Sequence, residues 1–202
     1  TTNSTDITDE SGDNVINSQE TTTSDISGTV EAGSTIDSLT VTDGINTITV
    51  DPNNITLNAD GTYSVNNVDL SSLSDGELTV SITSTDKAGN QTTSTDTISK
   101  DTVVDTTTAD LSSTSDTGVS DTDNITNDNT PTITGSTEAG ATVVITDEAG
   151  NEIGRATADS NGNYSITTTE LADGTQTLTV TATDSAGNTT TTTQRVTIDT
   201  TT

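Results

Sequence analysis

Hydrophobic residues alternate with threonine and other polar residues in short runs along the chain. The clearest run is TQTLTVTATD, residues 175–184, in which Leu178, Val180 and Ala182 fall on one face and threonines on the other. Alternation with a period of two predicts β-strands that bury one face. Threonine suits the outer face, because its β-branched side chain favours extended backbone. No stretch has the periodicity of an amphipathic helix, so the pattern predicts an all-β chain.

Turn-forming residues separate these runs in both halves of the chain. In the C-terminal half the turn signals are EAG, DEAGN, DSNGN, ADG and DSAGN, where Asn-Gly and Asp-Gly supply the positive φ that tight hairpins need. We expect strands there near residues 110–113, 131–137, 142–147, 152–158, 163–168, 175–184 and 189–199. In the N-terminal half we expect them near residues 26–30, 39–42, 45–50, 62–68, 77–86 and 91–99.

The chain contains two copies of one unit. TDKAGN at residues 85–90 recurs as TDSAGN at residues 183–188, and the two aspartates differ by 184 − 86 = 98 positions. Other landmarks keep the same order in both halves: DNVIN and DNITN, VEAGS and TEAGA, DGTYSV and NGNYSI. A period of about 100 residues exceeds that of solenoid repeats and matches a β-sandwich domain. We therefore predict two domains, residues 1–104 and residues 105–202.

Short strands with frequent turns indicate an immunoglobulin-like sandwich in each half. The fold class predicted is all-β, with two tandem immunoglobulin-like β-sandwich domains in an elongated end-to-end arrangement. The aromatic residues Tyr63 and Tyr164 occupy equivalent positions after a turn, and we expect each in the core of its domain. The other core residues expected are Ile26, Leu39, Val41, Val65, Val80, Ile82 and Ile98, and Ile133, Val143, Ile145, Ile166, Leu178, Val180, Val196 and Ile198.

Composition adds a second possibility, disorder, and narrows the choice of partners. Hydrophobic residues make up 25% of the chain and the formal net charge is −28, with 32 acidic and 4 basic residues. Low hydrophobicity with high charge is typical of disordered chains, but such chains do not keep ordered landmarks at a fixed period. So few cations exclude a nucleic-acid partner. No apolar run approaches the ~20 residues that span a bilayer, so we expect no membrane insertion.

The residue types present also argue against an enzyme. The chain has no His and no Cys, which removes the usual general base, disulfides and thiolate metal sites. Paired carboxylates can hydrolyse glycosides, but no Trp or Phe is available to stack a sugar. We therefore predict neither catalysis nor a small-molecule substrate. A module that binds a host or surface target through its loops remains the alternative, because immunoglobulin-like folds carry many functions.

Several motifs together resemble one known family. DNVINSQE at residues 13–20, SDTGVSDTDNITNDNTPTITG at residues 115–135, both TDxAGN hairpins and the DTTT segments at Asp105 and Asp199 resemble bacterial immunoglobulin-like extender repeats. Such repeats occur in tandem in giant adhesins of the repeats-in-toxin class. The first copy departs from the second in lacking the TP step after its DNxxN motif.

The resemblance implies a function and a location. It implies a calcium-rigidified rod that projects a distal ligand-binding domain from the bacterial surface in adhesion or biofilm formation. Its partners would be neighbouring repeats of the same polypeptide, and we expect a monomer. Type I export with a C-terminal signal would explain why these residues contain no Sec-type signal, and we expect the chain to be a fragment of a longer protein.

Acidic residues cluster in loops, which points to Ca²⁺ independently of the family. One cluster is Asp6, Asp9, Glu10 and Asp13, and another is Asp116, Asp121, Asp123 and Asp128. Ca²⁺ takes 6–8 oxygen ligands, and neither cluster has EF-hand spacing. Any site must therefore be assembled from separate loops. The alternative is that these loops are solvated acidic surface.

Topology predicts one such assembly. In an immunoglobulin-like sandwich the hairpin before the last strand lies at the same end as the N-terminus, so Asp105, Glu138 and Asp184 should converge on Ca²⁺ at the domain junction. Glu31 and Asp86 would be the counterparts of Glu138 and Asp184 in the first copy, and Asp199 that of Asp105 at the next junction. The alternative is that Asp184 only caps its own turn. Asp60 and Asp159 we assign to turns.

Overall fold

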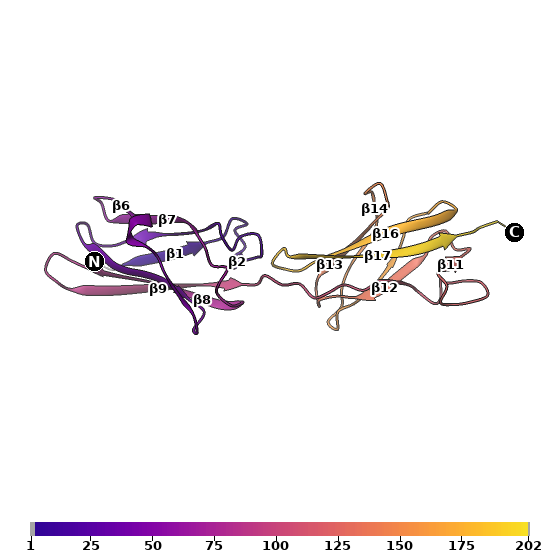
Figure 1. Ribbon diagram of the computed structural model, residues 1–202, viewed down its shortest axis with the longest axis horizontal. Helices are drawn as coiled ribbons and strands as arrows, with labels where there is room; N and C mark the ends of the chain where they lie inside the picture. Colours follow the sequence, from indigo (N-terminus) through magenta and orange to yellow (C-terminus); the bar gives the residue numbers. More distant parts are fainter. Residues whose placement is uncertain (1–2, 202) are drawn as a thin grey trace. The chain divides into compact units, whose positions relative to one another are not determined.

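The computed structural model describes residues 3–201 and divides into two compact units, Thr1–Val103 and Val104–Thr202 (Figure 1). The boundary expected from the repeat lies one residue further along the chain. Each unit is a two-sheet β-sandwich, which is the fold predicted from the alternating pattern. The following paragraphs describe each unit by itself.

The first unit follows the chain from β1 to β9. Its strands are β1 (Ser4–Thr8), β2 (Val15–Ile16), β3 (Ser24–Thr29), β4 (Thr35–Thr42), β5 (Thr47–Thr49), β6 (Thr56–Leu57), β7 (Thr62–Val68), β8 (Gly76–Thr85) and β9 (Gln91–Lys100). One sheet has the order β1-β3-β7-β6 and the other β2-β9-β8-β4-β5. A short 3₁₀ turn, Pro52–Asn54, follows β5. The two layers enclose one apolar core.

The second unit repeats this plan. Its strands are β10 (Asp110–Leu111), β11 (Ile125–Thr126), β12 (Thr132–Ser136), β13 (Thr142–Thr146), β14 (Glu152–Thr157), β15 (Asn163–Thr167), β16 (Gly174–Thr183) and β17 (Thr189–Ile198). One sheet has the order β10-β12-β15 and the other β11-β17-β16-β13-β14. In both units the last strand pairs parallel with a two-residue strand, β2 or β11, and antiparallel with the strand before it.

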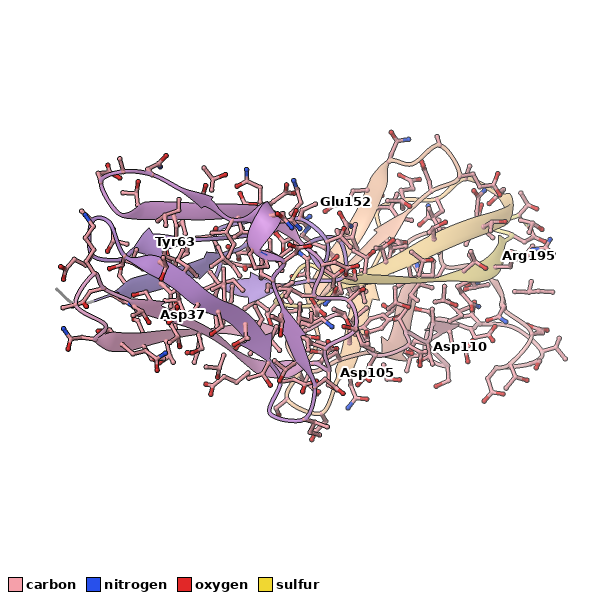
Figure 2. The ribbon with its side chains drawn as sticks, turned by 60° about the vertical axis from the view of Figure 1, so that its left-hand side comes forward. Asp37, Tyr63, Asp105, Asp110, Glu152 and Arg195 are labelled. Atoms are coloured by element: carbon pink, nitrogen blue, oxygen red, sulfur yellow. The ribbon has the colours of Figure 1, made fainter. Side chains whose placement is uncertain are left out.

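The predicted core residues are all buried. Every apolar side chain expected in the two cores has less than a tenth of its surface exposed, because each stands on the inner face of a strand with period-two alternation. Tyr63 and Tyr164 are buried as well, and Figure 2 labels Tyr63 among the strands of the first unit. Their hydroxyl groups donate to the carbonyls of Ser4 and Thr108 respectively. The two tyrosines thus tie the beginning of each unit to its core.

Several short elements were not predicted. The strands β1, β2, β6 and β11 each carry too few alternating residues to stand out, and they exist because longer strands offer them hydrogen-bond partners. The strand expected over residues 45–50 is shorter, since Ile45 lies in a turn with 88% of its surface exposed. Asp43 organises that turn by accepting hydrogen bonds from the backbone N–H groups of Ile45 and Asn46. Turn chemistry therefore overrides the strand propensity of isoleucine.

Candidate metal centre

The motif D-x-A-G-N forms the same turn at Asp86, Asp147 and Asp184. In each, Oδ1 of the aspartate accepts hydrogen bonds of 2.8–2.9 Å from the backbone N–H groups two and four residues later. Oδ2 accepts the side-chain amide of the asparagine that ends the motif, at 2.8–2.9 Å. The capping role proposed as the alternative for Asp184 is therefore observed. Capping does not distinguish the three turns from one another, because only some of them have acidic neighbours.

Hydrogen bonding sets the charge state of these caps. The side-chain amide of Asn90, followed by its backbone N–H, lowers the pKa of the Asp86 carboxyl below its ordinary value. Asn151 lowers the pKa of Asp147 in the same way. A carboxylate that accepts several N–H groups is stabilised in its ionised form. Both groups are therefore anions at neutral pH.

The second unit brings Glu138 close to Asp184. One carboxylate oxygen of Glu138 lies within 4.8 Å of one of Asp184. Glu138 begins the EAG turn between β12 and β13, which closes through the N–H of Ala141 and the carbonyl of Glu138. Antiparallel pairing sets Thr142 of β13 opposite Thr183 of β16, one residue before Asp184. Sheet register thus places the two acidic turns side by side.

Asp105 reaches the same end of the unit through its backbone. Its side chain is exposed, and its carbonyl accepts a long hydrogen bond of 3.5 Å from the hydroxyl of Thr137, next to Glu138. Three residues later, the N–H of Thr108 donates to the carbonyl of Ser136 at 2.8 Å. The structure therefore brings two of the three expected carboxylates together and places the third on the neighbouring backbone segment.

The equivalent residues of the first unit share a hollow. Glu31 and Asp86 line a depression of about 210 Å³ together with Asn3, Ser34, Ser84, Asn90 and Thr92. Lys87 occupies the position that Ser185 has in the second unit, and its Cε lies 2.6 Å from where a Cβ on Gly33 would stand. A lysine therefore covers the EAG turn of the first unit. The two units thus differ in charge at corresponding ends.

Asp199 corresponds to a different residue from the one expected. Asp199 donates its N–H to the carbonyl of Thr126 at 2.8 Å, and Asp101 donates its N–H to the carbonyl of Ile16 at 3.0 Å. The repeat offset agrees, since 199 − 98 = 101. The expected equivalence of Asp199 with Asp105 is therefore wrong. The sequence alone contains this equivalence, because the 98-residue offset between the two TDxAGN motifs relates Asp199 to Asp101 at the end of β9.

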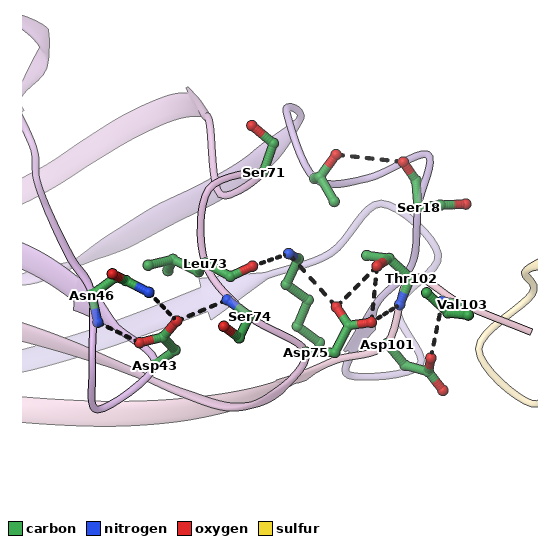
Figure 3. Close-up of polar contacts among 12 residues, drawn as sticks. Ser18, Asp43, Asn46, Ser71, Leu73, Ser74, Asp75, Asp101, Thr102 and Val103 are labelled. Atoms are coloured by element: carbon green, nitrogen blue, oxygen red, sulfur yellow. Dashed lines mark hydrogen bonds and ion pairs between the residues drawn. The ribbon is translucent and has the colours of Figure 1, made fainter.

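A lysine–aspartate pair marks the end of the first unit (Figure 3). The Nζ of Lys100 donates to the carbonyl of Leu73 and lies 3.6 Å from Oδ1 of Asp75. Asp75 in turn accepts the N–H and the hydroxyl of Thr102. In the second unit Asp173 accepts the same two groups of Thr200. Asp75 directly before β8 and Asp173 directly before β16 thus hold in place the chain that leaves β9 and β17.

The acidic cluster at residues 6–13 divides into two parts. Oδ1 of Asp9 accepts the N–H of Gly12 at 3.0 Å, and its Oδ2 accepts those of Asp13 and Val15. Asp13 itself caps Val15 at 2.9 Å. Asp6 is separate: burial, followed by the charge of Asp96 on β9, raises the pKa of its carboxyl. Asp9 and Asp13 are thus turn-forming residues here.

The cluster at residues 116–128 forms one long loop before and around β11. Asp123 caps Ile125, with 3.1 Å between Oδ1 and the backbone nitrogen. Asp128 accepts the hydroxyl of Ser115 and the N–H of Thr130. Asp121 is exposed at the tip, and Asp116 is buried.

The turn roles expected for Asp60 and Asp159 are confirmed, since each accepts the N–H two residues later.

Comparison with known proteins identifies the second unit. Residues 102–200 match the bacterial Ig-like domain family. No curated protein sequence matches the chain. Among the described residues no helix is long and apolar enough to cross a membrane.

Similar solved structures include three adhesion proteins. A tetra-tandem repeat from the extending region of a large adhesion protein is 28% identical over 99% of this chain and 50% of that chain, with a TM-score of 0.40. A 1.5-MDa bacterial ice-binding adhesin is 25% identical over 98% and 65%, with a TM-score of 0.47. A Ca²⁺-stabilised adhesin with which an Antarctic bacterium reaches out and binds ice is 26% identical over 98% and 49%, with a TM-score of 0.49.

The chain spans half to two thirds of the length of these structures. The first unit has the strand plan of the second. It also has the buried tyrosine and the D-x-A-G-N turn in the same places. The second unit therefore matches the bacterial Ig-like domain family, and the chain is a tandem of two Ig-like β-sandwiches with one strand plan.

Proposed function

We propose that the chain is a stalk segment of a bacterial surface adhesin, stiffened by Ca²⁺ at the end of the second unit that carries Glu138 and Asp184. It would lie outside the cell, join neighbouring repeats of the same polypeptide and hold a distal binding domain away from the surface. The Ig-like family and the tandem repeat support the class of protein. Both aromatic side chains are buried, which weighs against direct ligand binding by loops, because binding sites are usually rich in exposed aromatics.

The close approach of Glu138 and Asp184 carries the proposal. Two like charges ~4 Å apart repel by roughly 4 kcal/mol at an effective dielectric near 20. Their carboxylate oxygens lie within 4.8 Å on two separate turns, and a chain of net charge −28 has few cations of its own to relieve this repulsion. Ca²⁺ prefers such carboxylate oxygens and adds backbone carbonyls to them. The carbonyl of Asp105 lies on the adjoining segment.

The segment that leads into the second unit would supply further ligands. Asp101 corresponds to Asp199 and precedes Asp105 by four residues, 105 − 101 = 4. An ion that binds both this segment and the two turns would restrict bending of the chain there. Binding to the folded form alone would also stabilise it, by ~2.7 kcal/mol when free Ca²⁺ is 100 times Kd. Extracellular Ca²⁺ modules have Kd values of about 10⁻⁴–10⁻³ M.

Small-angle scattering and thermal unfolding of the whole chain, in EDTA and in 5 mM CaCl₂ (a concentration on the order of ten times such a Kd), test the proposal. We expect Ca²⁺ to increase the maximum particle dimension, to narrow the cross-section and to raise the melting temperature. Glu138→Gln should reduce both responses, since it removes one charge without changing size. Asp101→Ala and Asp105→Ala then report which residues of the entering segment contribute.

Asp147→Asn is the matched control for Asp184→Asn. Both aspartates cap an identical turn, so both variants lose the same local hydrogen bonds. Among residues 3–201, Asp147 belongs to no group of three neighbouring acidic side chains. Only Asp184→Asn should therefore abolish the Ca²⁺-induced change in particle shape. Equal responses in the two variants, or a wild-type shape that ignores Ca²⁺, would refute the proposal.

A further inference from the structure

A buried carboxylate in the second unit has an oxygen without a partner. Only 5% of the surface of Asp116 is exposed. Its Oδ2 accepts the N–H of Asn124 at 3.2 Å, whereas its Oδ1 is buried and has no hydrogen-bond partner. Burying an ionised carboxylate without compensation is strongly unfavourable. Such an oxygen needs either a cation or a proton to be stable in the fold.

The corresponding loop of the first unit, before β2, forms with its carboxylate oxygens hydrogen-bonded to the backbone. Asn14 and Asn124 correspond, since both adopt the left-handed conformation, with φ of 67° and 58°, just before β2 and β11. In the first unit Oδ2 of Asp9 accepts the N–H groups of Asp13 and Val15, on either side of Asn14, and its Oδ1 accepts that of Gly12. Buried Glu20 likewise uses both oxygens, on the N–H groups of Ser11 and Asn17. The first loop is thus satisfied by its own backbone.

In the loop before β11 of the second unit, the backbone supplies a hydrogen bond to only one of the two oxygens of Asp116. Among residues 3–201 no lysine or arginine forms an ion pair with Asp116; the pairs found are Lys100 with Asp75 and Arg155 with Glu152. A second carboxylate is close along the backbone. Asp116 accepts the N–H of Asn124, and Asp123 accepts the next N–H, that of Ile125. Two anions are therefore held on consecutive amides, one of them with a free oxygen.

We propose that this loop binds one Ca²⁺ inside the second unit, with Oδ1 of Asp116 as the central ligand and Asp123 and loop carbonyls around it. Hard oxygen donors of this kind suit Ca²⁺, which accepts six to eight of them in flexible geometry. The ion neutralises the buried charge, which a water molecule cannot do. The site is separate from Glu138 and Asp184, because β17 runs from the turn of Asp184 to the pairing with β11. In the first unit Asp9 already uses both oxygens on backbone N–H groups, so the proposal concerns the second unit.

Residue-resolved NMR of the ¹⁵N-labelled whole chain, titrated with CaCl₂ to about ten times a Kd of ~10⁻³ M, tests this inference. We expect the amides of Asn124 and Ile125 to shift with saturation. The amides of Ala186 and Asn188 report on Glu138 and Asp184 in the same titration, so failure of either site is visible without the other. Asp116→Asn should weaken binding at Asn124 and Ile125 at least tenfold and leave the amides of Ala186 and Asn188 unchanged.

Asp9→Asn provides the matched control in the first unit. It should destabilise its loop and leave the Ca²⁺ shifts of Asn124 and Ile125 as in the wild type. A melting experiment adds a second readout: in EDTA, Asp116→Asn should melt at or above the wild-type temperature, because it removes an unbalanced buried charge. In CaCl₂ it should melt below the wild type. Unshifted Asn124 and Ile125 amides, or the same melting order in both buffers, would overturn the site.

Discussion

Aspartate side chains shape the turns by accepting hydrogen bonds from nearby backbone N–H groups. Asp159 shows how: its Oδ1 accepts the N–H groups of Asn161 and Asn163 at 2.8 and 2.9 Å. These hydrogen bonds, that of Asn163 first, lower the pKa of the carboxyl below its ordinary value. The acidic composition is therefore partly structural, because a chain with many tight hairpins needs many such acceptors. Only the carboxylates left close to another anion, or without a partner, call for a cation.

The lowered pKa of Asp159 gives a prediction about acid. A carboxyl whose folded pKa lies below its unfolded value stabilises the fold above the unfolded pKa, and this stability is lost as the pH falls through the folded value. We expect the melting temperature in EDTA to drop as the pH falls from about 5 towards 2. Asp159→Asn should reduce that drop. Circular dichroism melts at stepped pH measure both, and an unchanged acid dependence in the variant would contradict the assignment.

Strands in this protein also carry charges that oppose each other. In the first unit β1 lies against β9, and the N–H of Ile7 donates to Oδ2 of Asp96 at 3.3 Å. Asp6 on β1 is thereby held beside Asp96. In the second unit the corresponding positions are Asp110 and Gln194, 194 − 96 = 98, so the like-charge pair exists in the first unit only. Strand pairing, which buries Ile7, brings this repulsion with it.

Removing that repulsion should stabilise the first unit at neutral pH. The folded pKa of Asp6 is raised, by burial and then by Asp96. The folded state therefore binds the proton more tightly, and the contribution of Asp6 to stability falls as the pH rises through the raised value. We expect Asp6→Asn to gain less than about 1 kcal/mol at pH 7, since Asp6 is solvent-exposed and Asp96 is only half-buried. The gain should vanish near pH 3.

Urea unfolding of Asp6→Asn and wild type at the two pH values measures this difference. Asp110→Asn in the second unit is the matched control, because its neighbour Gln194 is uncharged. A gain of equal size in Asp110→Asn would attribute the effect to net charge instead of the pair.

The whole molecule must balance a large negative charge. A net charge of −28 destabilises a compact chain by self-repulsion, and simple salt screens such repulsion over a Debye length of about 10 Å at 0.1 M. Bound Ca²⁺ acts differently, because it neutralises particular carboxylates at short range. The two contributions can therefore be separated by experiment.

We expect 5 mM CaCl₂, which is on the order of ten times a typical extracellular Kd, to raise the melting temperature more than NaCl of equal ionic strength. The physical reason is that screening is shared by all charges, whereas the proposed coordination would act only at Glu138, Asp184 and Asp116. Scanning calorimetry in EDTA-treated buffer, then with either salt, makes the comparison. MgCl₂ serves as a second control, since Mg²⁺ demands stricter geometry. If NaCl reproduced the whole effect of CaCl₂, diffuse counterions would replace bound ions as the explanation.

The longer strands and the cores of both units could be read from the order of residues alone. Leu178 and Val180 are buried because side chains alternate along a strand, and the usual burial of aromatic bulk was enough to assign Tyr164 to the core. The equivalence of the two halves followed from TDKAGN and TDSAGN. These are local patterns, so they need no knowledge of which strand pairs with which.

The acidic sites depended on the folded chain. The approach of Glu138 to Asp184 follows from the register of β13 on β16, and the match of Asp101 to Asp199 from the pairing of the last strands with β2 and β11. Asp9 and Asp116 are the same residue type in acidic loops of the two units. Both oxygens of Asp9 accept hydrogen bonds, whereas Oδ1 of Asp116 accepts none. Whether a carboxylate is capped, paired or unbalanced is decided by backbone groups distant in sequence, and residue spacing carries no record of them.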